Sequence, residues 1–199
     1  MEHTYPCLND KTKDTPVEPI YFYQNSWAAK KIFEIHPQRH VDVGSAANAI
    51  SIIAQLVPTT MVDIRPLPVE VDGLTFVKGS ILHLPFANNS LESVSSICVI
   101  EHIGLGRYGD KLDPRGSEKA IKELQRVVKH RGYVVISVPI DATPQTHFNA
   151  HRTFTPELVH SLFSECRLVE EKYIYGYSMH DSYEAKNGFG TGLYLFQKK

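Results

Sequence analysis

The architecture follows from one short stretch, His40-Val41-Asp42-Val43-Gly44-Ser45, which has the pattern of a buried strand that runs into a glycine turn. The residues that follow, Ala46 to Val57, are apolar almost all round and stop before Pro58, as expected for a helix packed on a sheet. A strand, a turn and a helix in this order are typical of a parallel sheet covered by helices. The sequence therefore predicts an α/β fold.

The rest of the chain continues this alternation. Further strands are expected at Thr60 to Arg65, Leu74 to Lys78, Val94 to Glu101, Gly132 to Pro139, Leu168 to Tyr175 and Gly192 to Gln197. Helices are expected at Tyr21 to His36, at about Pro114 to His130 and from Thr155 to about Ser164. Only nine residues, Pro66 to Leu74, join the second and third strands, so we expect an irregular connection there. The fold class is Rossmann-like and doubly wound, a mostly parallel sheet of about seven strands with helices on both faces.

Composition limits the kind of protein. Of the 199 residues, 42% are hydrophobic and 22% charged, and the net charge of −1 offers no positive field to nucleic acid or an anionic membrane. The three cysteines are odd in number and widely spaced, which argues against a disulfide framework or a zinc site. No apolar run approaches the about 20 residues of a membrane span, and Met1 to Pro19 lacks a signal-peptide pattern. We expect a cytoplasmic protein without membrane insertion, with a polar lead-in over residues 1–19 and a single domain over residues 20–199.

The residues that end the strands are the candidates for binding, because ligands of open α/β sheets lie outside the carboxyl ends of the strands. Gly44 lets the backbone come close to a ligand. Asp63 ends the second strand 21 residues after Asp42, about where an acid can accept bonds from both hydroxyls of a ribose. Alternatively, Asp63 only pairs with Arg65. The glycine-rich pyrophosphate loop is absent after Gly44, which counts against a nicotinamide-dependent oxidoreductase.

The order of these features resembles the class I S-adenosylmethionine-dependent methyltransferases. The matching residues are Asp42-x-Gly44, Asp63, Gly79-Ser80-Ile81-Leu82-His83-Leu84-Pro85-Phe86 and Cys98-Val99-Ile100-Glu101-His102. A closer resemblance, to an uncharacterised branch of methyltransferase-like domains found in bacterial surface-carbohydrate settings, covers nearly the whole chain past Tyr21. It is carried by residues 21–30, Asp63-Ile64-Arg65-Pro66, residues 104–110 and Phe148-Asn149-Ala150-His151-Arg152.

The resemblance implies S-adenosyl-L-methionine as cofactor and a methyltransferase-like domain over residues 20–199. The implied cofactor-binding residues are Asp42, Gly44, Ser45, Asp63, Ile64, Gly79, Ser80, Ile81 and Glu101. Ser80 stands where many relatives have an acid that accepts a bond from the adenine amino group. A neutral hydrogen bond contributes ~1 kcal/mol against ~1.5 to 3 for one with a charged partner, so we expect weaker cofactor binding than is typical.

His102 is the first candidate for a catalytic base, because methyl transfer to a hydroxyl needs a proton acceptor and an imidazole with a pKa of ~6.5 is neutral at cytosolic pH. His151 and Asp110 are the other candidates for this role. Alternatively, His102 only binds loop backbone. Arg107 and Tyr108, on the long loop Gly104 to Pro114, are expected either to contact substrate or to belong to a solvated loop.

The segment after the fifth strand carries Asn149 and Arg152, for which substrate contact is expected, with structural hydrogen bonding as the alternative. A metal site formed by His147, His151 and Asp141 is disfavoured because no helical spacing fixes these side chains, and no metal is predicted. Strand periodicity places Tyr173, Tyr175 and Tyr177 on one face, for packing rather than as an aromatic platform for carbohydrate.

The sequence therefore predicts O-methyl transfer from S-adenosylmethionine to a hydroxyl of a small-molecule or glycan acceptor. The competing hypothesis is a degenerate binding module that keeps the fold without catalysis. Direct binding of the cofactor separates the two.

Overall fold

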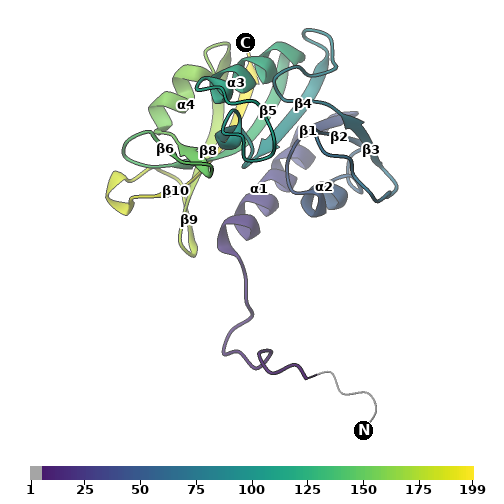
Figure 1. Ribbon diagram of the computed structural model, residues 1–199. Helices are drawn as coiled ribbons and strands as arrows, with labels where there is room; N and C mark the ends of the chain where they lie inside the picture. Colours follow the sequence, from purple (N-terminus) through teal and green to yellow (C-terminus); the bar gives the residue numbers. More distant parts are fainter. Residues whose placement is uncertain (1–5) are drawn as a thin grey trace.

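The computed structural model describes residues 6–199. Its strands are β1 (His40–Val43), β2 (Thr59–Asp63), β3 (Leu74–Lys78), β4 (Leu91–Ile97), β5 (Val128–Ile140), β6 (Gln145–His147), β7 (His151–Thr153), β8 (Cys166–Tyr175), β9 (Ser178–His180) and β10 (Gly190–Lys198). The central sheet has eight strands in the order β3-β2-β1-β4-β5-β10-β8-β9 (Figure 1). The first five of these run parallel, and β10 lies antiparallel between β5 and β8. This arrangement confirms the predicted mostly parallel α/β sheet.

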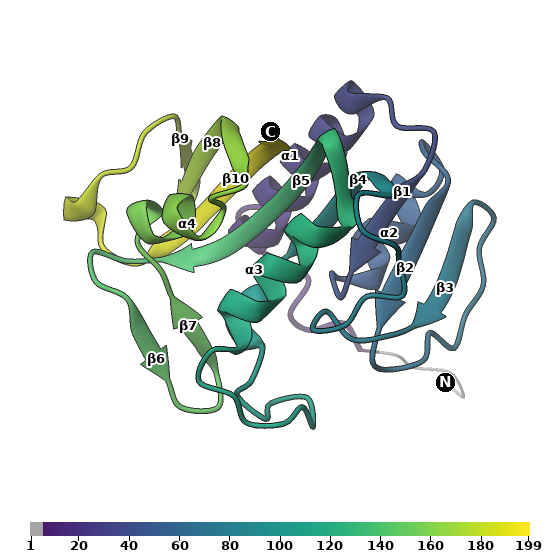
Figure 2. The same ribbon diagram turned by 90° about the horizontal axis from the view of Figure 1, so that it is seen from above.

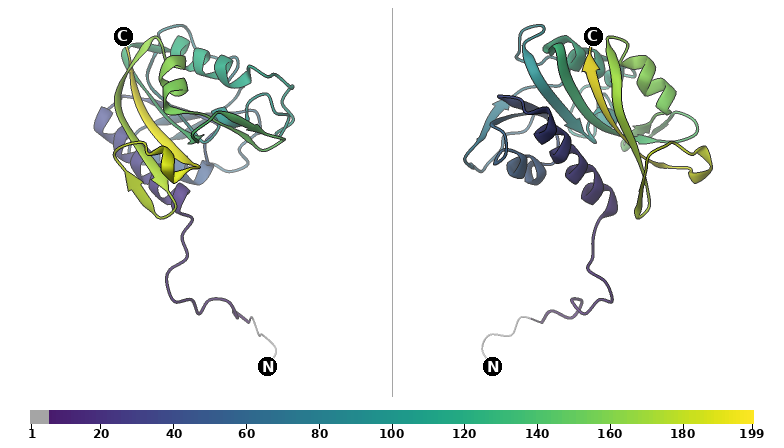
Figure 3. Two further views of the ribbon diagram at one scale, coloured as in Figure 1. Left: turned by 90° about the vertical axis from the view of Figure 1, so that its left-hand side faces the viewer. Right: turned by 180° about the vertical axis from the view of Figure 1, so that it is seen from behind.

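The helices α1 (Pro19–Ile35), α2 (Ala47–Ile53), α3 (Gly116–Val127) and α4 (Pro156–Leu162) cover both faces of the sheet. Figure 2 shows α3 and α4 on one face, and α1 lies across the opposite face in the right-hand view of Figure 3. Each face has its own buried core. Leu124, Ile136 and Phe163 belong to the core beneath α3 and α4, whereas Trp27 and Ile50 belong to the core beneath α1 and α2.

Capping residues explain where two of the helices begin. The Glu18 side chain accepts a hydrogen bond from the Tyr21 N–H, and Pro19 occupies the first position of α1. The Thr155 hydroxyl does the same for the Leu158 N–H at the start of α4. Residues 6–18 before α1 are exposed and contain neither helix nor strand, whereas Pro19, the last residue of the predicted lead-in, already belongs to α1. Residues 1–5 of that prediction lie outside the described residues.

The fourth strand ends earlier than predicted. β4 stops at Ile97 because Cys98 adopts the left-handed conformation, with φ 52°, and residues Ile100–His102 then form the 3₁₀ helix η1. Glu101 and His102 therefore lie on a helical turn and not at the end of a strand.

Other boundaries also differ from the prediction. α2 ends at Ile53 instead of Val57, and α3 gives way at Val128 to a long β5, before the predicted end at His130. The β6–β7 hairpin and β9 were not predicted, since strands of three residues carry little periodic signal. The connection after β2 is irregular, as predicted. Over residues 6–199, no helix is both long and apolar enough to cross a membrane.

Candidate functional site

Two adjoining cavities open at the carboxyl ends of β1, β2 and β4. The larger has a volume of about 570 Å³ and the smaller about 100 Å³. The two share six lining residues, Gly44, Asp63, Arg65, Cys98, His102 and Tyr108. Ligand sites of open α/β sheets lie at this edge, and the larger volume is within the roughly 300–1,000 Å³ of small-molecule sites. We take the two cavities together as the candidate site.

Two glycines, Gly44 and Gly79, line the smaller cavity at positions where a side chain would crowd a neighbouring valine. Gly44 has φ 75°, and a Cβ atom there would lie 3.0 Å from Val99 Cγ1. A Cβ atom on Gly79 would lie 2.9 Å from Val62 Cγ1. Both positions therefore bring the backbone close to the cavity without a side chain. The smaller cavity is also lined by three predicted cofactor-binding residues, Ile64, Ser80 and Ile81.

Asp42 lies buried below the cavities and does not line either of them. Its carboxylate accepts hydrogen bonds from the Ser45 N–H (3.1 Å), the Ser45 hydroxyl (2.6 Å) and the Ser95 hydroxyl (2.6 Å). Burial raises the pKa of Asp42 to about 6 in spite of these bonds. Asp42 therefore holds the Gly44 turn in place, and the Ser45 N–H is directed to Asp42 instead of to a ligand.

His40 continues this buried network on β1. Because the Ser95 hydroxyl donates its proton to Asp42, it accepts a hydrogen bond from His40 Nε2 at 2.9 Å, and the Ser93 hydroxyl then donates to His40 Nδ1 at 2.9 Å. Burial lowers the pKa of His40 to about 3, so its ring is neutral at physiological pH.

The neutral His40 ring predicts a pH-dependent stability. Between its unfolded pKa of 6.5 and its folded pKa of about 3, the unfolded chain binds a proton that the folded chain does not. The contribution of His40 to the unfolding free energy therefore falls by about 1.4 kcal/mol for each unit that the pH drops below 6.5. Asp42, whose folded pKa is raised, acts in the opposite direction between pH 6 and 4.

Comparison with a His40→Gln variant isolates the His40 contribution, because Asp42 is present in both proteins. We expect the stability advantage of the parent over His40→Gln to shrink by about 1.4 kcal/mol per unit from pH 6 to 4, measured by urea unfolding at each pH. A difference that stays constant across this range would show that His40 is not held neutral.

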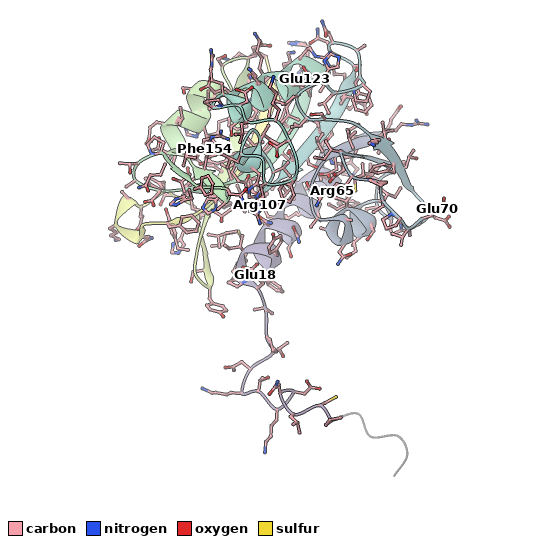
Figure 4. The ribbon with its side chains drawn as sticks, viewed as in Figure 1. Glu18, Arg65, Glu70, Arg107, Glu123 and Phe154 are labelled. Carbon is pink, nitrogen blue, oxygen red and sulfur yellow. The ribbon has the colours of Figure 1, made fainter. Side chains whose placement is uncertain are left out.

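Asp63 lines both cavities and is already paired in this structure. Its carboxylate accepts hydrogen bonds from the Arg65 N–H (2.8 Å) and from Arg65 Nη2 (3.2 Å). The Arg65 guanidinium lies 4.9 Å from the centre of the Tyr108 ring, and the Arg107 guanidinium lies 5.2 Å from the same centre. Figure 4 labels both arginines. The structure therefore contains the Asp63–Arg65 ion pair that was the alternative to ribose binding. Both residues of the pair line the two cavities.

His102 lines both cavities, and its two ring nitrogens have different surroundings. Its Nδ1 donates a hydrogen bond to the Ala150 carbonyl at 2.6 Å, which leaves Nε2 as the unprotonated nitrogen of the neutral ring. Burial lowers the pKa of His102, and the nearby Arg107 lowers it further, so the ring stays neutral at pH 7. His102 therefore both binds loop backbone, as the alternative proposed, and keeps a nitrogen that can accept a proton.

Glu101 is a buried carboxyl group in the wall of the larger cavity, 2% exposed. Its Oε1 lies 3.6 Å from His102 Nε2, and its Oε2 has no hydrogen-bond partner. Burial raises the pKa of Glu101 to about 8. A carboxyl group in this state is a proton donor at neutral pH and a potential anion when a cation is near.

Helix α1 contributes residues that sequence reasoning missed. Tyr21 lines the larger cavity, and Gln24 Oε1 accepts hydrogen bonds from Cys98 Sγ (3.0 Å) and from the Ser137 hydroxyl (2.9 Å). Phe189, before β10, also lines that cavity. The sequence carries no local signal for these contacts, since the partners of Gln24 lie more than 70 residues away.

The other two candidate bases are placed differently. Asp110 lines the smaller cavity, but its carboxylate accepts hydrogen bonds from the Gly104 N–H (2.6 Å) and the Tyr108 N–H (3.3 Å), which shape the loop. His151 lines the larger cavity, and its Nε2 is buried without a hydrogen-bond partner. Burial lowers the pKa of His151.

Two of the predicted substrate residues do not line either cavity. Asn149 is exposed in the β6–β7 turn, with φ 51°. The Arg152 guanidinium donates to the carbonyls of Ile103 (2.6 Å) and Asp113 (3.1 Å), at the two ends of the long loop. Arg152 therefore fastens this loop to β7, as the structural alternative proposed.

Neither the metal nor the tyrosine alternative gains support from the geometry. The rings of His147 and His151 lie 4.8 Å apart, but residues 6–199 contain no group of three or more His, Cys, Asp or Glu arranged to hold a metal ion. Tyr173 is fully buried in the core, whereas Tyr177 is 73% exposed. Because β8 ends at Tyr175, the prediction that Tyr177 shares a strand face with Tyr173 is wrong. Packing accounts for Tyr173.

The sequence matches one protein family. A family model described as Caenorhabditis protein of unknown function, DUF268, matches residues 75–183, which is more than half of the chain. A sequence search of curated proteins finds no match.

Solved structures share the fold at low sequence identity. The N-methyltransferase NodS from Bradyrhizobium japonicum WM9, in complex with S-adenosyl-L-homocysteine, superposes with a TM-score of 0.68 at 15% identity, covering 96% of this chain and 93% of its own. A Burkholderia thailandensis 1,6-didemethyltoxoflavin-N1-methyltransferase with bound S-adenosylhomocysteine gives 0.62 at 14%, covering 94% and 93%. The [4+2]-cyclase SpnF gives 0.63 at 11%, covering 86% and 80%. The fold is thus the Rossmann-like fold of class I methyltransferases.

Proposed function

The chain belongs to the DUF268 family, whose function is unknown, and from its fold we propose that the protein is an S-adenosylmethionine-dependent methyltransferase. The observation that carries the proposal is the pair of cavities at the carboxyl ends of β1 and β2, bordered by Gly44 and Asp63. The residues present fit the cofactor. Gly44 and Gly79 border the smaller cavity with backbone alone, and Glu101, in the wall of the larger cavity, has a buried oxygen without a partner.

The residues that would hold the cofactor divide between the two cavities. Ile64, Ser80 and Ile81 would contact its base in the smaller cavity, and Asp63 would accept bonds from the ribose hydroxyls. When bound, S-adenosylmethionine supplies a methyl group on a sulfonium centre, which is electrophilic. The protein then needs to exclude water, orient the acceptor and accept one proton.

His102 is the residue that we propose as proton acceptor. Its Nδ1 proton is held by the Ala150 carbonyl, so Nε2 takes the proton of an acceptor hydroxyl as the oxygen becomes a nucleophile. His151 and Arg107, which line the same cavity, would orient the acceptor. We propose a hydroxyl of a small or carbohydrate-like molecule as the acceptor group, in a cytoplasmic protein.

A second candidate function is a binding module with this fold that carries out no methyl transfer. The Asp63–Arg65 pair favours it, because the carboxylate that would hold a ribose is already bonded. SpnF, described as a [4+2]-cyclase, has a similar fold, so the fold alone does not determine the reaction.

The experiment that tests the proposal follows the methyl group. The protein is incubated with radiolabelled S-adenosylmethionine and a library of sugars and small hydroxyl compounds, and both labelled product and S-adenosylhomocysteine are measured. We expect label in at least one acceptor and an equal amount of S-adenosylhomocysteine. Binding of the cofactor without transfer to any acceptor would support the binding module instead.

A further inference from the structure

Two buried acids lie near the Gly44 turn, and they differ in what binds them. Asp42 accepts three hydrogen bonds from Ser45 and Ser95 and lines neither cavity. Glu101 lines the larger cavity, and its Oε2 has no partner. An unpartnered polar atom that is shielded from water is costly, so it is expected to receive a partner from a bound molecule.

The groups that face Glu101 do not provide that partner. His102 Nε2, at 3.6 Å from Oε1, is unprotonated, and the Cys98 thiol donates to Gln24. Burial raises the pKa of Glu101 and outweighs the Cys98 thiol and the positive charge of Arg107, each of which lowers that pKa, and Tyr21 of α1 lines the same cavity as an uncharged phenol. Within residues 6–199, no Lys or Arg nitrogen lies within 4.0 Å of the Glu101 carboxyl group.

We infer that Glu101 binds the ammonium group of the cofactor's amino-acid tail and gives up its own proton to solvent as that group arrives. This inference rests on the proposed function. A molecule whose ribose lies at Asp63, with its base in the smaller cavity, has only the larger cavity left for its tail. Glu101 lines only the larger cavity, as do Ser45 and Ala46 of the Gly44 turn. A charge-assisted bond there would satisfy the unpartnered oxygen.

The inference predicts proton release on binding. Burial raises the pKa of Glu101 to about 8, so the carboxyl group is protonated at pH 7 before a ligand binds. An ammonium group beside it lowers that pKa, and close to one proton should leave per bound ligand at pH 7. Affinity should therefore rise up to about tenfold per pH unit between pH 6 and 7 and level off above the pKa of Glu101.

Isothermal titration calorimetry of the full chain measures this directly. S-adenosylhomocysteine, which carries the ammonium group, is titrated at pH 7 in two buffers of different ionisation enthalpy. 5′-Methylthioadenosine, which has the same base, ribose and sulfur but no amino-acid tail, is the matched ligand. We expect proton release with the first ligand and none with the second.

A Glu101→Gln variant provides the control, since it keeps the side-chain shape and removes the titrating group. It should bind S-adenosylhomocysteine about tenfold or more weakly, release no proton and bind 5′-methylthioadenosine like the parent. If S-adenosylhomocysteine binds the parent without proton release and binds Glu101→Gln equally well, the inference is overturned while the proposed function stands. Glu101 would then face the acceptor. If neither nucleoside binds, the proposed function fails, and the inference fails with it.

Discussion

Replacing His102 by alanine should lower the rate of methyl transfer by ~10²- to 10⁴-fold, because a positioned general base contributes about that much. Affinity for S-adenosylhomocysteine should change only a few-fold, since His102 is proposed to act on the acceptor. Single-turnover rates with an acceptor found in the label-transfer experiment measure the first quantity, and calorimetry measures the second. Loss of rate without loss of binding would separate chemistry from cofactor recognition.

The pH dependence gives an independent check on the role of His102. Burial lowers the pKa of His102 below its ordinary 6.5, so the ring loses its ability to accept a proton only as the pH falls through that lowered pKa. The rate of the parent should therefore fall on the acidic side of pH 6.5, and the remaining rate of His102→Ala should lack this decrease. His151→Ala should instead raise KM for the acceptor. An unchanged rate in His102→Ala, with the acidic decrease intact, would transfer the base role to His151 or Asp110.

Replacing Asp63 by alanine should abolish measurable binding of S-adenosylhomocysteine, because the carboxylate accepts both ribose hydroxyls in the proposed complex. Arg65→Ala is the matched variant, since it removes the other half of the ion pair seen in this structure. The two substitutions should have opposite effects. Arg65→Ala frees the carboxylate from its present partner and should leave affinity equal to the parent or a few-fold tighter.

Thermal unfolding and calorimetry of both variants decide between the two roles of Asp63. If Asp63 serves only the ion pair, both variants should bind S-adenosylhomocysteine alike and lose similar stability. If Asp63 binds the ribose, only Asp63→Ala loses the ligand-induced increase in Tm. An Asp63→Ala protein that binds like the parent would make the ribose assignment wrong.

The elements with strong periodic patterns were predictable, and the irregular ones were not. β3 has the predicted bounds, Leu74 to Lys78, and the amphipathic α3 was recognised from its apolar face. The end of β4 was predicted wrongly because residues 98–100 continue the apolar pattern of a strand. The left-handed turn at Cys98 is accompanied by contacts from Ser137 and Gln24, which are distant in sequence and invisible to local patterns.

The candidate site, too, was predictable only where it does not depend on contacts between residues distant in sequence. Gly44 and Asp63 border the cavities from strand ends, because the carboxyl ends of parallel strands share one edge of the sheet, whereas His102 borders them from η1 and not from the strand end that was predicted. The sequence did not reveal that Asp42 is saturated by hydroxyl groups, since Ser95 lies on another strand. Contacts between residues distant in sequence decide whether a polar side chain faces a cavity or binds the protein itself. Arg152 is a second example, because it donates to the backbone carbonyls of Ile103 and Asp113.

The central claim, that the cavities at the ends of β1 and β2 hold S-adenosylmethionine or its product, is tested most directly by titrating S-adenosylhomocysteine into the full chain and measuring heat and melting temperature together. The account predicts a single site per chain and, at a ligand concentration about 100 times the Kd, about 2.7 kcal/mol of added stability, which raises Tm by several degrees. The account is contradicted if millimolar S-adenosylhomocysteine produces no heat of binding and no change in Tm.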